Sequence, residues 1–195
     1  MEILFATQNA NKLSEIRKIV GDSSKIIGLN DLNYTFDLEE TGDSIEANSL
    51  QKAEFIFNTF KMACFADDSG LLVECLNGEP GVHTAYYGGI PRSDQKNIEF
   101  LLHKMKSCQN RSASFVTVFT FKDHQTVKQF KGEVKGVITE DLRGTNGFGY
   151  DPIFIPEGFT ISFAQMSAEE KNKISHRAIA FKHLAAFLLD NFSSQ

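Results

Sequence analysis

Two adjacent aspartates follow a short apolar segment, and they are the residues of this chain best suited to chemistry. Residues 62–66 are apolar and predict a buried strand that runs directly into Asp67, Asp68, Ser69 and Gly70. Two like charges at the end of a buried strand are unfavourable unless something compensates them. We therefore expect a divalent metal, a basic side chain or an exposed cleft here, with residues 67–70 forming a turn.

A second acidic element stands earlier in the chain, at Glu39-Glu40-Thr41-Gly42. By itself it is a solvated charge pair before a turn; together with the aspartates it could form a carboxylate cage for a hard cation. Magnesium suits such a cage, because it takes carboxylate oxygens, keeps several waters and bridges to phosphates. Lys52, on the helix that follows, is then either a counter-charge for phosphate or a surface lysine.

The amino-terminal segment has the layout of an anion site. Residues 2–6 predict a strand, residues 7–11 a turn and residues 12–20 a helix. A helix N-terminus presents free N–H groups and a positive dipole end, and Lys12 adds a full charge. The segment lacks the glycines of a Walker loop, and an ordinary polar helix cap would look the same.

Two further stretches carry polar or aromatic residues in unusual settings. Residues 139–152 show no periodicity, and Phe148 and Tyr150 alternate there with glycines. These rings either form a stacking platform for a planar base or tuck into the core. Further on, Lys171 and Ser175 share a helix face that His176 and Arg177 do not. Either the helix breaks and restarts near Ser175, acting as an N-cap, or this polar group is partly at the surface.

The remaining elements alternate between strands and helices. Helices are predicted after a capping box of Asp43 and Glu46, over residues 93–106, and from a box of Ser167 and Glu170 to about residue 191. Further strands are predicted at residues 25–29, 71–75, 114–121, 127–138 and 152–155. Strands alternating with helices, plus one long hairpin, indicate an α/β fold with a mixed sheet.

Composition bounds the class of protein. At 195 residues we expect a single domain with room for two lobes, and the 18 phenylalanines predict a Phe-rich core. A net charge of −5 argues against a broad nucleic-acid surface. No apolar run of membrane-spanning length or signal-peptide pattern is present. Cys64, Cys75 and Cys108 lack metal-ligand spacing, so we expect reduced, packed thiols in a cytoplasmic protein.

Read together, these segments closely resemble the inosine/xanthosine triphosphate pyrophosphatases (Ham1-like proteins), which hydrolyse non-standard purine nucleoside triphosphates. Six motifs match in the family's order along nearly the whole chain. They are Ala6-Thr7-Gln8-Asn9-Ala10-Asn11-Lys12, Glu39-Glu40-Thr41-Gly42, Ala66-Asp67-Asp68-Ser69-Gly70-Leu71, Gly78-Glu79-Pro80-Gly81-Val82, Gly147-Phe148-Gly149-Tyr150-Asp151-Pro152 and Ser175-His176-Arg177. One motif would be suggestive, whereas six in register are highly specific.

The resemblance implies an elongated mixed β-sheet with flanking helices, two lobes around a central cleft, a magnesium requirement and a homodimer. It implies that Asp68 is the catalytic proton acceptor and that Glu40 and Asp68 bind magnesium. The residues that it assigns to the substrate are Thr7, Gln8, Asn9, Ala10, Asn11, Lys12, Lys52, Ser69, Phe148, Gly149, Tyr150, Asp151, Lys171, His176 and Arg177. The implied substrates are ITP, dITP and XTP, cleaved to the monophosphate and pyrophosphate, with no nucleic-acid or membrane partner.

The chain departs from the family pattern in two places. Related proteins usually carry arginine where this chain has Tyr86, and often Thr-Ala-Glu where it has Phe163-Ala164-Gln165. The first removes a charge, and the second alters a contact near the expected site. One rival interpretation is a related pyrophosphatase for modified or pyrimidine nucleotides. Another is a nucleotide-binding sensor without turnover, against which the intact acidic and basic positions argue.

Overall fold

The computed structural model describes residues 2–20, 25–36 and 38–192 and contains a mixed six-stranded sheet of order β2-β1-β3-β4-β5-β6. Strand β1 pairs in parallel with β2 and β3, and β6 pairs antiparallel with β5. The strands are β1 (Glu2–Phe5), β2 (Lys25–Gly28), β3 (Cys64–Val73), β4 (Ser112–Lys122), β5 (Val127–Ile138) and β6 (Phe154–Pro156). The helices are α1 (Ala10–Val20), α2 (Ile45–Phe60), α3 (Asp94–Lys104), α4 (Ala168–Ile174) and α5 (His176–Phe192). The predicted mixed sheet with flanking helices is confirmed.

The chain divides into two compact units. Unit 1 comprises Met1–Asp68, Thr117–Gly132 and Arg177–Gln195, and unit 2 comprises Ser69–Val116 and Glu133–His176. The boundaries fall inside β3, β4 and β5, so each of these long strands contributes residues to both units.

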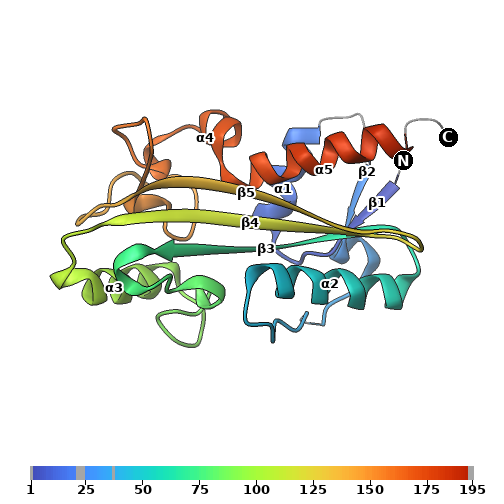
Figure 1. The fold of residues 1–195 in the computed structure, drawn as a ribbon, viewed down its shortest axis with the longest axis horizontal. Helices are drawn as coiled ribbons and strands as arrows, with labels where there is room; N and C mark the ends of the chain where they lie inside the picture. Colours follow the sequence, from blue (N-terminus) through green and yellow to red (C-terminus); the bar gives the residue numbers. More distant parts are fainter. Residues whose placement is uncertain (1, 21–24, 37, 193–195) are drawn as a thin grey trace. The chain divides into compact units, whose positions relative to one another are not determined.

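Unit 1 has a hydrophobic cluster on each face of its part of the sheet, and Figure 1 shows α2 on one side of the strands with α1 and α5 on the other. Phe5 and Phe65 stack with ring centroids 4.6 Å apart and pack with α1 and α5. Cys64 and Ala66 pack instead with Ala53, Ile56 and Phe57 of α2. Because side chains alternate along a strand, these two clusters give the facing direction of each β3 residue.

Unit 2 has its own core, in which the sheet packs against α3 and the segment after β5. Its members include Leu71, Ile98, Phe115 and Phe154, and the Phe115 and Phe154 rings meet edge to face at 4.6 Å. The predicted Phe-rich core is therefore confirmed in both units: Phe5, Phe65, Phe119, Phe121, Phe154 and Phe163 are all less than 2% exposed.

Several predicted boundaries are wrong, and one difference affects the site. Residues 67–70 are not a turn but the middle of β3, which runs unbroken from Cys64 to Val73. Helix α1 begins at Ala10, two residues before the predicted start. The N-cap of α2 is Ser44, not Asp43, because the Ser44 side chain accepts the backbone N–H of Ala47.

The carboxy-terminal helical segment breaks near Ser175, which was one of the two alternatives that the sequence left open. Helix α4 begins with the predicted capping box of Ser167 and Glu170 and ends at Ser175, whose backbone is extended. Helix α5 begins at the next residue, His176. Since Lys171, Ser175, His176 and Arg177 are all buried, this polar group does not lie at the surface.

The prediction of three reduced cysteines is wrong for two of them. Cys75 and Cys108 form a disulfide in unit 2, with Cα atoms 6.1 Å apart. Spacing could not reveal this pair, because the two residues are separated by 33 positions and meet only through the fold. Cys64 remains a free, buried thiol, and burial raises its pKa to about 12.

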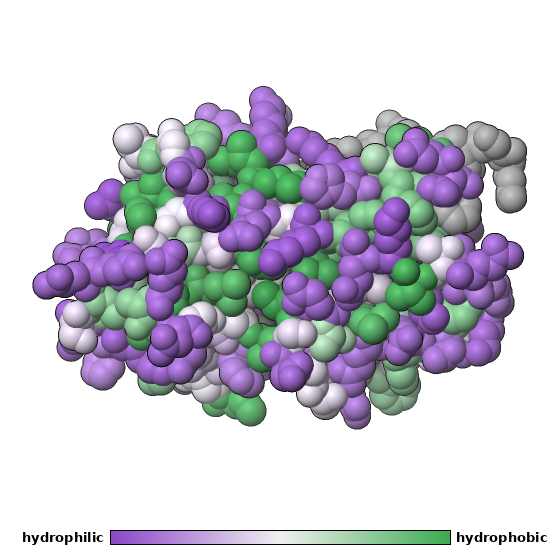
Figure 2. Space-filling view, viewed as in Figure 1, coloured by the Kyte–Doolittle hydropathy of each residue, from purple (hydrophilic) through white to green (hydrophobic). Residues whose placement is uncertain are grey.

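One face of the molecule is mixed in character. On the face seen in Figure 2, hydrophilic residues are interspersed with hydrophobic ones. Within the part of the chain that the structure describes, no helix is both long and apolar enough to cross a membrane.

Candidate active site

The two adjacent aspartates of β3 have opposite surroundings in unit 1. The side chain of Asp67 lies on the same face of β3 as Phe65, toward α1 and α5. The side chain of Asp68 lies on the same face as Ala66, toward α2. Asp67 is 1% exposed and Asp68 is 7% exposed. The continuous strand therefore separates two carboxylates that a turn would have brought together, and each must have its own partners.

Asp67 is compensated by two basic side chains. Its Oδ2 atom lies 2.8 Å from the Nζ of Lys12, on α1, and 3.7 Å from the Nε of Arg177, on α5. Burial by itself would raise the pKa of Asp67, but attraction to Lys12 and Arg177 outweighs it and holds that pKa below its ordinary value. Asp67 is thus an ionised carboxylate that orients Lys12 and Arg177.

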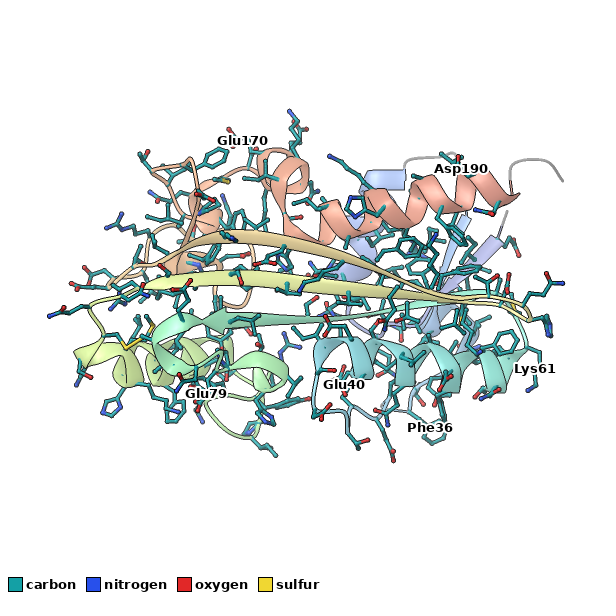
Figure 3. The ribbon with its side chains drawn as sticks, in the orientation of Figure 1. Phe36, Glu40, Lys61, Glu79, Glu170 and Asp190 are labelled. Atoms are coloured by element: carbon teal, nitrogen blue, oxygen red, sulfur yellow. A yellow bond between two sulfur atoms is a disulfide. The ribbon has the colours of Figure 1, made fainter. Side chains whose placement is uncertain are left out.

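Asp68 belongs to a second charged group, which contains both predicted metal ligands. The ammonium of Lys52, on α2, pairs with the carboxylate of Glu40 and lies 3.5 Å from Oδ1 of Asp68. Figure 3 shows Glu40 beside the amino-terminal end of α2. Lys52 is only 5% exposed, so its interpretation as a surface lysine is wrong. Glu40 and Asp68 therefore converge on a common cation.

The electrostatics of this second group differ from those around Asp67. Burial raises the pKa of Asp68, and attraction to Lys52 and Lys12 offsets this only in part. Burial would lower the pKa of Lys52, yet attraction to Asp68 and Glu40 raises it overall. For Lys12, burial lowers the pKa despite Asp67, and repulsion by Lys52 and Arg177 adds to the effect. Asp68 is consequently the β3 carboxylate with the greater tendency to take up a proton.

The turn before α1 is organised by its own side chains. Asn9 Oδ1 accepts the backbone N–H groups of Asn11 and Lys12, at 3.0 and 3.2 Å, so Asn9 caps the helix. Thr7 Oγ1 accepts the N–H of Asn9 at 3.2 Å. The Gln8 amide is turned elsewhere and donates to the carbonyl of Phe36 at 2.6 Å. The predicted turn is therefore a capped helix start with Lys12 in its first turn, and binding of an anion there stays a prediction.

A further polar group lies in unit 2. Asp151 Oδ2 accepts the backbone N–H of Phe148 at 2.9 Å and lies 2.7 Å from the Nζ of Lys171. That Nζ stands 4.5 Å from the centroid of the Phe148 ring. The backbone N–H of Gly149 donates to Oδ2 of Asp94 at 2.6 Å. The loop of residues 147–151 is thus held from both sides.

The two aromatics of this loop have different surroundings. Tyr150 is 2% exposed, joins the core of unit 2 and donates its hydroxyl to the carbonyl of Thr84. Phe148 is half-buried, so only this ring keeps a surface available for stacking. His176 is buried, with its ring stacked at 4.8 Å on that of Phe115. Ser69, the first residue of unit 2, is half-buried in β3.

Two of these residues did not emerge from the sequence. Asn48, on α2, is 2% exposed and donates from Nδ2 to Oδ2 of Asp68 at 3.3 Å. The sequence pattern that could have indicated Asn48 is its position one helical turn before Lys52, on the helix face that also carries the buried Ile45. Asp94, at the start of α3, gave no signal beyond that of an ordinary acidic residue in a first helical turn.

The donor set is that of a hard, oxygen-preferring cation. Across residues 2–20, 25–36 and 38–192, no group of three or more His, Cys, Asp and Glu side chains is placed to hold a metal. Glu40 and Asp68 provide two carboxylates that already share one cationic group, Lys52. Mg²⁺ is commonly bound through one or two protein carboxylates with waters and substrate phosphates completing its shell. The residues present fit such an ion.

Comparison with known proteins identifies the family of this chain. The model of the Ham1 family matches residues 3–187. The dITP/XTP pyrophosphatase of Christiangramia forsetii is 46% identical over 188 residues, which is 96% of this chain and 99% of that protein. The dITP/XTP pyrophosphatase of Porphyromonas gingivalis is also 46% identical, over 96% of this chain and 97% of that one.

Solved structures give the same result. The Staphylococcus aureus Ham1 protein matches with a TM-score of 0.89 at 41% identity, over 97% of this chain and 99% of that one. A nucleoside-triphosphatase / dITP/XTP pyrophosphatase from Mycobacterium abscessus matches with a TM-score of 0.78 at 37% identity, over 96% and 99% of the two chains. The resemblance predicted from the six motifs is confirmed, and the chain belongs to the Ham1 family.

Proposed function

We propose that this protein hydrolyses non-standard purine nucleoside triphosphates (ITP, dITP and XTP) between the α and β phosphates. The products are a nucleoside monophosphate and pyrophosphate, and the reaction clears such nucleotides from the pool. The observation that carries the proposal is that the carboxylates of Glu40 and Asp68 both lie beside the ammonium group of Lys52. This group belongs to the same unit as the capped turn at Lys12. Relatives named dITP/XTP pyrophosphatase that match over nearly the full length support it.

In this proposal the triphosphate is bound by the turn of residues 7–12. The start of α1 supplies the positive end of the helix dipole, although Asn9 already accepts the backbone N–H groups of Asn11 and Lys12. Lys12 and Lys52 add two cationic side chains, which stabilise the negative charge that develops on the departing pyrophosphate. Asp67 holds Lys12 in position from the opposite side of β3 to Asp68.

We assign the metal to Mg²⁺, held by Glu40 and Asp68. When bound, the ion supplies positive charge to the phosphate oxygens and lowers the barrier to cleavage. Asp68 accepts the proton of the attacking water as its oxygen bonds to phosphorus and the α–β anhydride bond breaks. The raised pKa of Asp68 supports this role. A positioned base of this kind contributes about 10²–10⁴-fold to the rate.

Recognition of the base is assigned to Phe148, Gly149, Tyr150, Asp151, Lys171, His176 and Arg177, with Ser69 as a further substrate contact. Phe148 offers the stacking surface, while Tyr150 acts from the core by shaping the loop. Inosine and xanthosine present a C6 carbonyl and an N1–H, whereas adenine presents an amino group and an unprotonated N1. Donors such as His176, Arg177 or a backbone N–H would therefore favour these bases over adenine by about 10⁴-fold or more.

The experiment is a substrate panel scored for pyrophosphate rather than free phosphate. We expect kcat/KM for ITP, dITP and XTP to exceed the value for ATP, with no turnover in EDTA; GTP, whose base has the same C6 carbonyl and N1–H, tests whether the site also rejects a 2-amino group. Equal values across the panel would refute the proposed selectivity. Nucleotide binding without pyrophosphate release would instead indicate a sensor. In Asp68→Asn we expect pyrophosphate release to fall at least about 10²-fold; substantial Mg²⁺-dependent release by this variant would refute the role of Asp68.

We further propose that residues 1–195 act as one catalytic domain, that the protein is a cytoplasmic homodimer, and that it has no nucleic-acid partner. The cytoplasmic assignment follows from where nucleoside triphosphates are made and used, and it implies that the Cys75–Cys108 bond is open in that reducing compartment. Sedimentation equilibrium over a range of concentrations tests the dimer, and a mass equal to that of one chain throughout would exclude it.

A further inference from the structure

The side chain of Asn48 links the two proposed metal ligands of unit 1. Asn48 Nδ2 donates to Oδ2 of Asp68 at 3.3 Å, and its Oδ1 accepts the backbone N–H of Gly42 at 2.7 Å. Gly42 lies two residues after Glu40 in the same loop. One amide group therefore connects the strand that carries Asp68 with the loop that carries Glu40.

The orientation of this amide is determined by its neighbours. The backbone N–H of Gly42 can only donate, so the atom of Asn48 facing it must be the oxygen. The NH₂ group is then left facing Asp68, where a carboxylate can accept. An amide is suited to this place because it has a donor at one end and an acceptor at the other.

Asn48 itself is fixed by the start of α2. Ser44 caps the helix by accepting the backbone N–H of Ala47 at 3.1 Å. The hydroxyl of Ser49, which follows Asn48 in the sequence, donates to the carbonyl of Ala66 and lies 2.8 Å from Oγ1 of Thr120. The side-chain hydrogen bonds of Ser49 thus go to β3 and β4, whereas those of Asn48 go to Asp68 and the loop that carries Glu40.

Gly42 is required for the other end of the link. A Cβ atom at this position would lie 2.8 Å from Oδ1 of Asn48 and 2.8 Å from Cβ of Ala47. Both contacts are closer than real Cβ atoms adopt, so a side chain here would force the loop away from α2. Only glycine lets the Glu40 loop approach closely enough for the bond to Asn48.

We infer that Asn48 is a positioning residue that sets the separation between Glu40 and Asp68 for the metal ion. The inference rests on the proposed function, since it concerns the same Mg²⁺. Glu40 lies on a half-exposed loop, whereas Mg²⁺ demands near-ideal octahedral geometry with short bonds to oxygen. Residues that orient metal ligands typically change metal affinity by 10–100-fold when they are replaced.

The test measures binding of Mg²⁺ alone by titration calorimetry, without nucleotide, together with the Mg²⁺ concentration that gives half-maximal pyrophosphate release. Asn48→Leu removes both hydrogen bonds at similar volume, and we expect metal binding about 10–100-fold weaker. Saturating Mg²⁺ should restore part of kcat. Gly42→Ala, on a more exposed loop, breaks only the link to Glu40 and should weaken Mg²⁺ binding in the same direction.

Ser49→Ala is the matched control. It removes a buried polar group from the neighbouring position on the same helix turn, so it lowers the melting temperature but should leave Mg²⁺ affinity unchanged. Because both test changes act through one link, the double variant should bind Mg²⁺ no more weakly than the worse single variant. Wild-type Mg²⁺ affinity in Asn48→Leu, or equal weakening in Ser49→Ala, would overturn the inference. Absence of pyrophosphate release by the wild type would refute the proposed function instead, and the calorimetric comparison would still decide the role of Asn48.

Discussion

Asp67 and Asp68 are consecutive residues of β3, yet their carboxylates belong to different charged groups on opposite faces of the strand. Asp67 pairs with the cations of α1 and α5, and Asp68 lies with Lys52 and Asn48 of α2. This arrangement lets one short stretch of sequence serve two purposes. One carboxylate holds basic side chains in place, and the other remains available to a metal ion and a proton.

The first prediction is that the two aspartates have opposite effects on stability. Asp67→Asn leaves the buried cations Lys12 and Arg177 without their carboxylate, so we expect a loss of about 3–5 kcal/mol in the free energy of unfolding. Asp68→Asn removes a charge that burial disfavours, so stability should stay the same or rise slightly. Urea unfolding in EDTA at pH 7 measures both. A larger loss in Asp68→Asn than in Asp67→Asn would contradict the assignment.

The second prediction concerns pH. The pKa of Asp67 lies below the ordinary 3.8, so its contribution to stability is present above that pH and is lost as the pH falls further. The pKa of Asp68 lies above 3.8, so the folded state keeps a proton that the unfolded state has released, and the free energy of unfolding falls as the pH rises from 3.8 through the raised value. In EDTA, Asp68→Asn should therefore match the wild type at low pH and become relatively more stable at higher pH. A difference in the opposite direction would refute the raised pKa.

The sequence was most informative where structure depends on local contacts. The capping box of Ser167 and Glu170 was predicted correctly because both partners lie within one helical turn. The box at Asp43 was one residue out, since Ser44 beside it is an equally good cap. Residues 67–70 looked like a turn because they are polar and end in glycine, but pairing in the centre of a sheet outweighed that propensity.

What the sequence could not give is pairing between distant residues. Asn48 and Asp68 are 20 positions apart, and their contact follows from α2 packing on β3. The opposite orientations of Asp67 and Asp68 could be predicted only if the strand was known to continue through both residues. The six family motifs contain most of the residues that we propose for the site, but not the amide that connects two of those motifs.

The third prediction compares two glycines of the loop that carries Phe148. Gly147 and Gly149 both have positive φ, at 78° and 62°. A Cβ at Gly147 would lie 2.1 Å from Oδ2 of Asp151, whereas at Gly149 nothing lies within 4 Å. Gly149→Ala should therefore cost only the strain of the left-handed conformation, about 1–2 kcal/mol.

Gly147→Ala should cost more, because it also displaces Asp151 from Lys171 and from the N–H of Phe148. We expect roughly 3 kcal/mol or more, measured by urea unfolding in the same buffer. The KM for ITP should rise as well, since the loop that presents Phe148 loses its support. Equal losses of stability in the two variants would show that Asp151 does not brace this loop.

The last prediction concerns the cysteines. Closing 33 residues with the Cys75–Cys108 bond should stabilise the oxidised protein by about 3–4 kcal/mol over the reduced form, by loop-closure entropy. Urea unfolding with and without dithiothreitol measures this, and Cys75→Ser should behave like the reduced wild type in both conditions.

After reduction, iodoacetamide at pH 8 should modify Cys75 and Cys108 but leave Cys64 unmodified until the protein unfolds. The reason is that Cys64 is buried with a pKa of about 12, so little of it is thiolate at that pH. Rapid labelling of Cys64 in the folded protein would show that β3 and α2 open at this point.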